Sequence, residues 1–286
     1  MEADGSKLVT LAKIPLLYIL RRDLQLSCPD EHGIVTNWDD MQKIWHHTLY
    51  DQLLVAPEEQ ALLITEAVLK NREKSAEIFF ETFGVPAFNI GKQALLSLFA
   101  SGYSTGLAVQ SGEGVTEKKD RGVTMGLETA RAIKEKCCAV SGDLKKEDGT
   151  VSKDYKLPDG QIIRLGMKRF ATEVLFDPKL LNLSVDGIHK KVHDSLNKLE
   201  DDKRKDVTNG IFLGGGNTLL SGIETRLKTE LSQLGIEAVI RVPAECKFST
   251  WIGGSMRTAL SVYQHLWVVR EEYDEYGANI INTKKF

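Results

Sequence analysis

The chain has 286 residues, 42% of them hydrophobic and 27% charged, which is the composition of an ordinary soluble globular protein. Its 37 Lys and Arg residues are balanced by 40 Asp and Glu residues, so the formal net charge is -3. Because no basic excess is available to neutralise a phosphate backbone, this balance argues against nucleic acid as a partner. The length is enough for one large domain or two modest ones, each with its own core.

The cysteine spacing fits neither a disulfide framework nor a zinc site. The four cysteines are Cys28, Cys137, Cys138 and Cys246, of which two are adjacent and none forms a CxxC pair. Neighbouring cysteines rarely bridge each other. A reduced cytosolic or nuclear compartment is therefore the simplest expectation.

An apolar run near the N-terminus, Leu8–Leu20, is interrupted by Lys13 and Pro15. It is too short to span a bilayer, and it follows an acidic leader instead of the basic start of a signal peptide. We expect a buried strand or an amphipathic docking segment there, and no association with a membrane.

Strand and helix patterns alternate along the rest of the chain. Trp38, Met41 and Trp45 recur at helical spacing after Asn37, which predicts a helix that ends at about Leu53. Further helices are expected at Asn71–Phe83, Ile90–Ser101, Glu128–Val140, Ile188–Leu199, Gly222–Leu234 and Gly253–Trp267. Strands are expected at Ala61–Thr65, Thr105–Val109, Gly210–Leu213 and Ala238–Val242, with a hairpin at Tyr155–Ile163. The alternation favours an α/β architecture with crossover connections.

Two glycine turns directly follow expected strands, at Gln110–Gly114 (QSGEG) and Gly214–Thr218 (GGGNT). Glycine lets backbone N–H groups approach an anion closely, and a following helix adds its positive end. Neither turn matches GxGxxG or the GxxxxGK[ST] phosphate loop, so a dinucleotide or Walker site is disfavoured. Facing each other, the two turns would suit a nucleotide polyphosphate, but each alone is more often a simple tight turn.

One pair of histidines has a spacing that could present metal ligands. His189 and His193 stand four residues apart on an expected helix, with Asp186 nearby. The pair lacks the internal acid of HExxH, so solvated helix positions are expected and no metal site is assigned.

A series of longer motifs resembles the actin family. The block Glu31–Thr48, EHGIVTNWDDMQKIWHHT, is nearly the actin signature. The blocks that follow in actin order are Val55–Glu59 (VAPEE), Leu62–Ala67 (LLITEA), Asn71–Lys74 (NREK), Gln93–Gly102 (QALLSLFASG), Ser111–Thr116 (SGEGVT), Ile133–Cys138 (IKEKCC), Leu157–Ile163 (LPDGQII), Gly214–Ile223 (GGGNTLLSGI), Lys247–Ser255 (KFSTWIGGS) and the tail to Phe286. The resemblance implies the α/β actin fold, with two lobes of ribonuclease-H-like topology around a nucleotide cleft, here in a truncated two-lobe form.

By position, the resemblance also implies a division into domains. Residues 1–103, completed by 248–286, would form the large actin subdomain with a replaced N-terminal segment. Residues 104–247 would form the second lobe, with an internal deletion after about 116.

The cofactor implied by the resemblance is ATP or ADP with Mg²⁺. Gln93 would help to place the attacking water for in-line phosphoryl transfer. The implied nucleotide contacts are Ser111, Gly112, Glu113 and Gly114 in the second phosphate loop, Arg131, Lys134 and Glu135 beside the adenine and ribose, and Gly215, Gly216, Asn217, Leu219 and Lys247 on the far wall.

Several departures from the family pattern fall on the catalytic parts. The first phosphate loop, with the aspartate that holds the metal through water, has no counterpart in residues 1–23. Gln110 and Glu113 stand where the second loop has aspartates, and Glu117 stands where a histidine is expected. Phosphoryl transfer depends on positioning and on charge stabilisation by the metal and both loops. We therefore expect no efficient ATP hydrolysis and no protein-held metal, whereas nucleotide binding stays open.

The resemblance places a partner-binding groove at Phe99–Ser104 and Met256–Leu266. An apolar groove that accepts an amphipathic helix is a common recognition mode, and the partners implied here are actin or actin-binding proteins. Arg257 stands where actin has a leucine, so partner choice should differ. For Leu260, a role in completing the core is equally compatible with the pattern.

Three functions follow as hypotheses. The first is an actin-like cytoskeletal protein of the cytoplasm with a degenerate nucleotide cleft, which binds partners or caps filaments. The second is an ATP-hydrolysing actin represented by an incomplete chain. The third is a nuclear actin-related subunit of a chromatin-remodelling complex.

Overall fold

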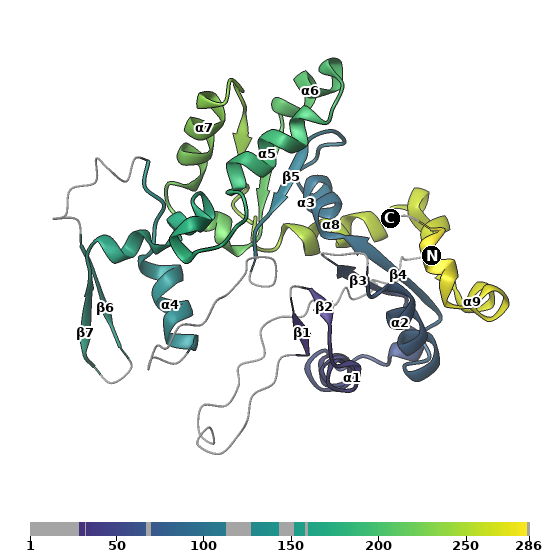
Figure 1. The fold of residues 1–286 in the computed structure, drawn as a ribbon. Coiled ribbons are helices and arrows are strands. Elements are labelled where there is room, and N and C mark those ends of the chain that lie inside the picture. The colour runs from purple at the N-terminus through teal and green to yellow at the C-terminus, as the bar shows by residue number, and fades with distance from the viewer. Residues whose placement is uncertain are drawn as a thin grey trace. The chain divides into compact units, whose positions relative to one another are not determined.

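The computed structural model describes residues 29–31, 33–66, 70–112, 127–142, 152–157 and 160–284. The expected N-terminal segment Leu8–Leu20 lies outside these residues. The chain divides into two compact units, which are described separately (Figure 1). Unit 1 comprises Met1–Leu96 and Thr250–Phe286, and unit 2 comprises Ser97–Ser249. The domain boundaries expected at 103 and 248 stay a prediction.

Unit 1 is built on a mixed three-stranded sheet with the order β10-β4-β3. Strand β3 (Leu62–Glu66) pairs in parallel with β4 (Ala87–Lys92), and β10 (Val268–Val269) pairs antiparallel with β4. A short hairpin joins β1 (Asp30–Glu31) to β2 (Ile34–Val35). The helical segments are α1 (Trp38–His46), η1 (His47–Gln52), η2 (Pro57–Glu59), α2 (Arg72–Glu77), η3 (Ile78–Thr82), α3 (Gln93–Ala100, which runs on into unit 2), α8 (Ser249–Thr258, which begins in unit 2), η8 (Ser261–Leu266), α9 (Arg270–Tyr276) and η9 (Ala278–Asn282).

The expected helix after Asn37 is confirmed, and its cap explains where it begins. The Asn37 side chain accepts a hydrogen bond from the backbone N–H of Asp40 at 3.1 Å, which satisfies one donor of the first turn. Acidic Asp39 and Asp40 in that turn also favour the positive end of the helix dipole.

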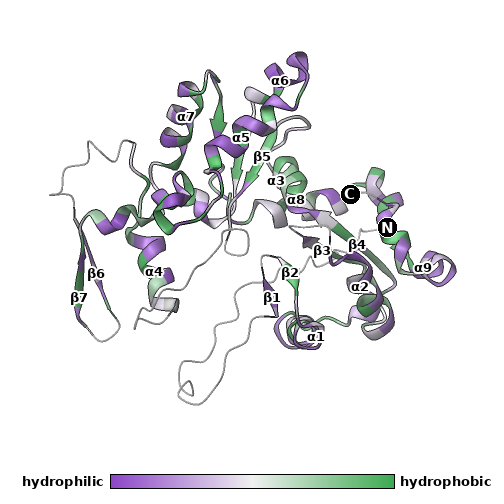
Figure 2. Cartoon of the chain, in the orientation of Figure 1, coloured by the Kyte–Doolittle hydropathy of each residue, from purple (hydrophilic) through white to green (hydrophobic). Residues whose placement is uncertain are grey.

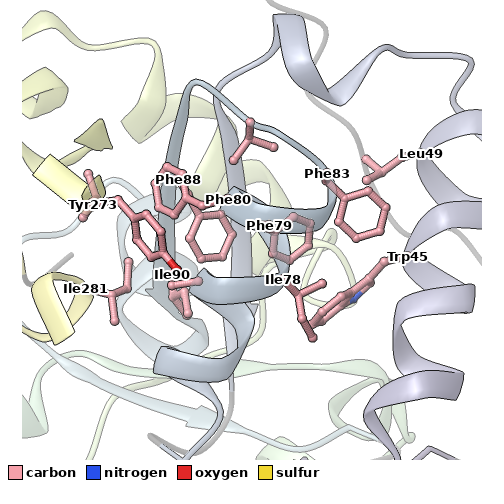
Figure 3. Close-up of a cluster of buried hydrophobic side chains, with 13 residues drawn as sticks. Trp45, Leu49, Ile78, Phe79, Phe80, Phe83, Phe88, Ile90, Tyr273 and Ile281 are labelled. Atoms are coloured by element: carbon pink, nitrogen blue, oxygen red, sulfur yellow. The ribbon is translucent and has the colours of Figure 1, made fainter. Parts of the chain in front are cut away.

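An aromatic cluster forms the core of unit 1 (Figure 3). The Phe79 ring lies 4.7 Å from Trp45 and 4.7 Å from Phe88, centroid to centroid, and Phe80 stacks on Tyr273 at 4.4 Å. These rings come from α1, η3, β4 and α9, and Phe79 is only 1% exposed. Residues far apart in the sequence therefore bury one another, which stabilises the unit as a whole.

A buried ion pair joins three further segments of unit 1. Arg72 Nε donates to Glu66 Oε1 at 2.5 Å, and its other nitrogens donate to the carbonyl oxygens of Ile90 at 2.8 Å and Ile281 at 3.2 Å. Burial raises the pKa of Glu66, although the Arg72 hydrogen bond works in the opposite direction. The guanidinium thus ties β3 and β4 to η9 near the C-terminus.

Two helix predictions for unit 1 were wrong at their boundaries. The helix expected at Ile90–Ser101 begins only at Gln93, because residues up to Lys92 continue β4 in parallel pairing with β3. The helix expected at Gly253–Trp267 begins earlier, as α8, and a break at 259–260 separates it from η8. Tertiary pairing overrode the local apolar pattern in the first case.

Unit 2 contains a parallel three-stranded sheet with the order β5-β8-β9. The strands are β5 (Leu107–Gln110), β8 (Ile211–Gly214) and β9 (Ile240–Arg241). A separate hairpin pairs β6 (Lys153–Lys156) with β7 (Ile162–Leu165). The helical segments are α4 (Leu127–Cys137), η5 (Met167–Leu175), η6 (Pro178–Leu181), α5 (Ile188–Asn197), α6 (Asp201–Thr208), η7 (Gly216–Leu219) and α7 (Ile223–Gln233).

The core of unit 2 lies between its sheet and the helices α5 and α7. Ile211, Leu227 and Leu231 are fully buried there, in one cluster with Leu196. Helix α6 was not predicted from the sequence because it has no apolar face. Figure 2 shows it as largely hydrophilic. Across the described residues, every helix is too short or too polar to cross a membrane.

A tight turn follows β8 and requires glycine at one position. Gly215 has φ +89°, and a Cβ there would lie 2.4 Å from the carbonyl oxygen of Ser111. The Gly215 N–H donates to the Cys246 carbonyl at 2.8 Å. Only a residue without a side chain permits this approach in that backbone conformation.

Replacing Phe79 by Ala should strongly destabilise the protein. The change removes a ring that three other rings contact, and core substitutions of this kind cost about 3–5 kcal/mol. Chemical denaturation of the purified chain measures the loss. The control is Leu54→Ala, which alters a side chain that is 81% exposed and should change the free energy of unfolding by less than about 0.5 kcal/mol.

Replacing Gly215 by Ala should cost at least about 1–3 kcal/mol, because the methyl group meets the Ser111 carbonyl in a backbone region that only glycine adopts readily. Gly216→Ala is the matched control, since a Cβ at Gly216 meets nothing within 4 Å. In thermal unfolding, the melting temperature of Gly215→Ala should therefore be clearly lower than that of Gly216→Ala. Equal melting temperatures would contradict the described turn.

Candidate functional site

The candidate site lies where β5 and β8 end side by side in unit 2. Gln110 pairs with Gly214 in the parallel register, and the Ser111 N–H donates to the Gly214 carbonyl at 2.8 Å. The two glycine turns found in the sequence therefore begin next to each other. The carboxyl ends of adjacent parallel strands are the usual place for a ligand in an open α/β sheet.

Gln110 contributes a neutral amide to this edge of the sheet. Its side chain lies against Gly214, where an added Cβ would be 2.4 Å from Gln110 Nε2. Gln110 Nε2 is buried and has no hydrogen-bond partner among the described residues. The amide has no negative charge with which to organise metal-bound water.

Asn217 connects the two turns with each other and with α4. Its Nδ2 donates to Ser111 Oγ and to the Gly112 carbonyl, each at 3.2 Å. Its Oδ1 accepts from Lys134 Nζ at 3.1 Å, and its backbone N–H donates to the Ser111 carbonyl at 3.0 Å. Of the residues predicted from the resemblance, Asn217 is thus in direct contact with both Ser111 and Lys134.

The remaining predicted residues of unit 2 differ in their exposure and in the element that carries them. Gly215 and Gly216 form the turn after β8, and Leu219 at the end of η7 is 52% exposed. Arg131 and Glu135 flank Lys134 on α4, Arg131 half-buried and Glu135 exposed. Lys247 is exposed, with its Nζ 5.8 Å from the Phe248 ring, and the residue before it, Cys246, accepts the Gly215 hydrogen bond.

Three predicted residues lie outside the described part of unit 2. Glu113 and Gly114 lie outside the described residues. Gln93, the predicted water-positioning residue, is the first residue of α3 and belongs to unit 1, where its carbonyl accepts from Thr250 Oγ1 at 3.4 Å.

His189 was expected at a solvated helix position, and this expectation was wrong because the side chain lies buried in a polar network. It is 9% exposed, its ring stacks on Phe176 at 5.9 Å, and its Nε2 lies 3.9 Å from Glu230 Oε2. Burial lowers the His189 pKa, against the opposing effect of Glu230. Among the residues that the structure describes, no group of three or more His, Cys, Asp or Glu side chains could hold a metal ion.

The sequence analysis did not identify the ion pairs behind this network. Arg226 donates from Nη1 to Glu173 Oε2 at 2.8 Å and to the Ser141 carbonyl at 2.8 Å, and from Nε to Glu230 Oε1 at 2.7 Å. Arg226 and Glu230 are four apart on α7, which is a detectable spacing, but Glu173 lies 53 residues away.

The predicted partner-binding segments belong to different units. Phe99–Ser104 belongs to unit 2. Met256–Leu266 belongs to unit 1 and comprises the last residues of α8, the break and η8. Three side chains of this segment are exposed, Met256 by 45%, Leu260 by 44% and Val262 by 65%. The exposure of Leu260 argues against a role in completing the core. The Arg257 guanidinium lies 4.4 Å from the Tyr263 ring centroid, and burial lowers the pKa of Arg257.

These residues suit a phosphate group better than a protein-held metal. Lys134 brings a positive charge to the Asn217 amide, which in turn contacts the Ser111 hydroxyl. A hard divalent cation prefers carboxylate oxygens, and at the end of β5 the described side chain is the amide of Gln110. Among the described residues, the positive charge of Lys134 and the neutral amide of Gln110 therefore suit an anion such as a phosphate better than a divalent cation.

Comparison with known proteins identifies the family. The actin family model matches residues 15–118 and 122–286. The chain is also 38% identical to an "Actin-like protein" of Neurospora crassa over 316 residues, which is 93% of this chain and 83% of that protein. This chain belongs to the actin family and has the actin-like α/β fold.

Proposed function

We propose that this chain is an actin-like cytoskeletal protein of the cytoplasm that acts by binding partner proteins and not by efficient ATP hydrolysis. Gln110 carries the proposal. It ends β5 with a neutral, buried amide where the family pattern has an aspartate that organises metal-bound water. Without that charge, the metal ion lacks one of the groups that would hold it for phosphoryl transfer.

The same site retains features that favour a phosphate-bearing ligand. Two glycine turns begin at adjacent strand ends, and the Lys134 ammonium lies at hydrogen-bond distance from the turn after β8. We therefore propose that the glycine turns bind ATP, ADP or a related polyphosphate, and that Mg²⁺ contributes little to the affinity.

Replacing Gln110 by Asp should make ATP binding depend on Mg²⁺. The new carboxylate would supply the missing charge, so the ratio of ATP affinities with Mg²⁺ and with EDTA should rise by about tenfold. Gln110→Asn is the control, because it shortens the side chain without adding charge. Calorimetric titration of the wild-type chain and both variants measures the ratio.

The proposal has a clear opposite outcome. If the wild-type chain binds Mg²⁺–ATP with micromolar affinity and releases phosphate at a measurable rate, the chain is a working ATPase. In that case Gln110 does not disable the site, and the ATP-hydrolysing alternative is correct.

For partner binding, we propose the exposed surface that Met256 of α8, Leu260 of the following break and Val262 of η8 form. Three exposed apolar side chains within seven residues offer anchors for the apolar face of an amphipathic helix. Arg257, from the same segment, would favour a partner that places a carboxylate beside the apolar contact.

Val262→Asp should weaken binding to actin filaments by about tenfold, since a charge within an apolar contact removes one anchor and leaves the carboxylate unpaired. Co-sedimentation of the purified chain with actin filaments measures the affinity. Leu54→Asp is the control, because Leu54 is 81% exposed and lies outside this surface. If both variants weaken binding equally, or if the wild-type chain does not bind, the proposal that actin binds this surface is wrong.

A further inference from the structure

Cations from three elements of unit 2 gather around the C-terminal end of α4. The Lys153 ammonium of β6 donates to the Lys136 carbonyl at 2.5 Å, and the Lys136 ammonium lies 5.7 Å from the centroid of the Tyr155 ring. Just beyond α4, the Ala139 N–H donates to the Arg169 carbonyl of η5 at 3.0 Å. The cations that these segments carry are called the basic surface, and they are Lys136, Lys153, Lys156, Lys168 and Arg169.

No carboxylate pairs with the basic surface in the part of the chain that the structure describes. Its four lysines are exposed, Arg169 is half-buried, and none of the five forms an ion pair there. On the same hairpin, by contrast, the Arg164 charge is matched by Asp154, whose Oδ1 lies 3.0 Å from Arg164 Nε. The dipole of α4 favours a cation at the end of that helix, but its influence falls off within one turn and does not account for Lys156 or Lys168.

The local charge of the sequence differs from that of the whole chain. Residues 127–170 contain ten Lys and Arg residues against seven Asp and Glu residues, whereas the whole chain has 37 against 40. The formal net charge of -3 therefore conceals a basic region. A patch of one sign attracts a partner of the opposite sign whatever the net charge of the chain, so the partner of the basic surface should be anionic.

Two exposed apolar side chains accompany these cations. Ile162 of β7 is 67% exposed and is the cross-strand partner of Lys156, so their side chains lie on the same face of the β6–β7 hairpin. Met167, the first residue of η5, is 41% exposed and directly precedes Lys168. Figure 2 shows both hydrophobic and hydrophilic residues on this hairpin. An acidic peptide needs only the cations, whereas a membrane surface uses both kinds of side chain.

We propose that the basic surface binds the anionic headgroups of a lipid bilayer, with Ile162 and Met167 entering the boundary between headgroups and acyl chains. The protein then lies on a membrane and does not cross it, so this binding needs no spanning helix. The expected absence of membrane association concerned the apolar run Leu8–Leu20, which takes no part here. Neither the glycine turns nor the surface of α8 and η8 is required, and lipid binding therefore adds a second kind of partner to the proposed function.

Co-sedimentation of the purified chain with lipid vesicles tests this binding. The probes are vesicles of phosphatidylcholine alone and vesicles of phosphatidylcholine with phosphatidylserine. The chain should sediment only with the anionic vesicles, and the binding should weaken as the salt concentration rises. Because each cation near an anionic bilayer raises the affinity about fivefold, replacing Lys153, Lys156 and Lys168 together by Gln should weaken binding about a hundredfold.

The matched control replaces three exposed lysines elsewhere in unit 2, Lys191, Lys198 and Lys205, by Gln. It removes the same charge from the chain as the first triple variant but should leave vesicle binding nearly unchanged. Ile162→Ser tests the apolar contact and should weaken binding about fivefold at low and at high salt, because apolar burial is not screened. Thermal unfolding of every variant shows whether a loss of binding merely follows a loss of stability.

Four results would overturn the membrane as the partner. The first is no sedimentation of the wild-type chain with anionic vesicles, and the second is equal sedimentation with both kinds of vesicle. The third is equal weakening by the two triple variants, which would show a response to net charge and not to the basic surface. The fourth is unchanged binding of Ile162→Ser, which would leave only the cations and assign the surface to an acidic protein.

Discussion

The close approach of two turns at the ends of β5 and β8 is the constraint on which the candidate site depends. Parallel pairing of Gln110 with Gly214 brings the Ser111 carbonyl so near to Gly215 that no side chain fits between them. That contact sets the position from which the Asn217 backbone and side chain reach Ser111. The polar centre of unit 2 therefore follows from one register of strand pairing and one glycine.

In both units, an arginine ion pair connects segments that are distant in sequence. In each, an arginine pairs with a buried carboxylate and also donates to a backbone carbonyl of another segment. Arg72 pairs with Glu66 and donates to the Ile90 and Ile281 carbonyls in unit 1. Arg226 pairs with Glu173 and Glu230 and donates to the Ser141 carbonyl in unit 2. Removing one partner of such a pair leaves a buried charge unmatched, which is far more destabilising than losing an exposed ion pair. These pairs specify which segments meet, and the aromatic and aliphatic cores supply most of the stabilisation.

Local signals in the sequence predicted the parts of the fold that depend on near neighbours. The cap at Asn37 and the glycines after β8 are of this kind, and so was the identity of the family, which long ordered motifs carry. Residues 90–92 were assigned wrongly because an apolar run fits a helix or a buried strand equally, and only pairing with β3 decides between them. The bond between Asn217 and Lys134 joins positions 83 residues apart, so no local pattern could indicate it.

The discontinuity of unit 1 has a consequence for the order in which the protein is made. The Ile281 carbonyl completes the hydrogen bonding of Arg72, and the two residues are separated by 209 positions. During synthesis, unit 2 has left the ribosome before the segment from Thr250 onward that closes unit 1. The aromatic core around Phe80 then waits, partly uncovered, for Tyr273. A nascent chain in that state exposes apolar surface until the segment from Thr250 onward has emerged, and this is the interval in which a chaperone would protect it.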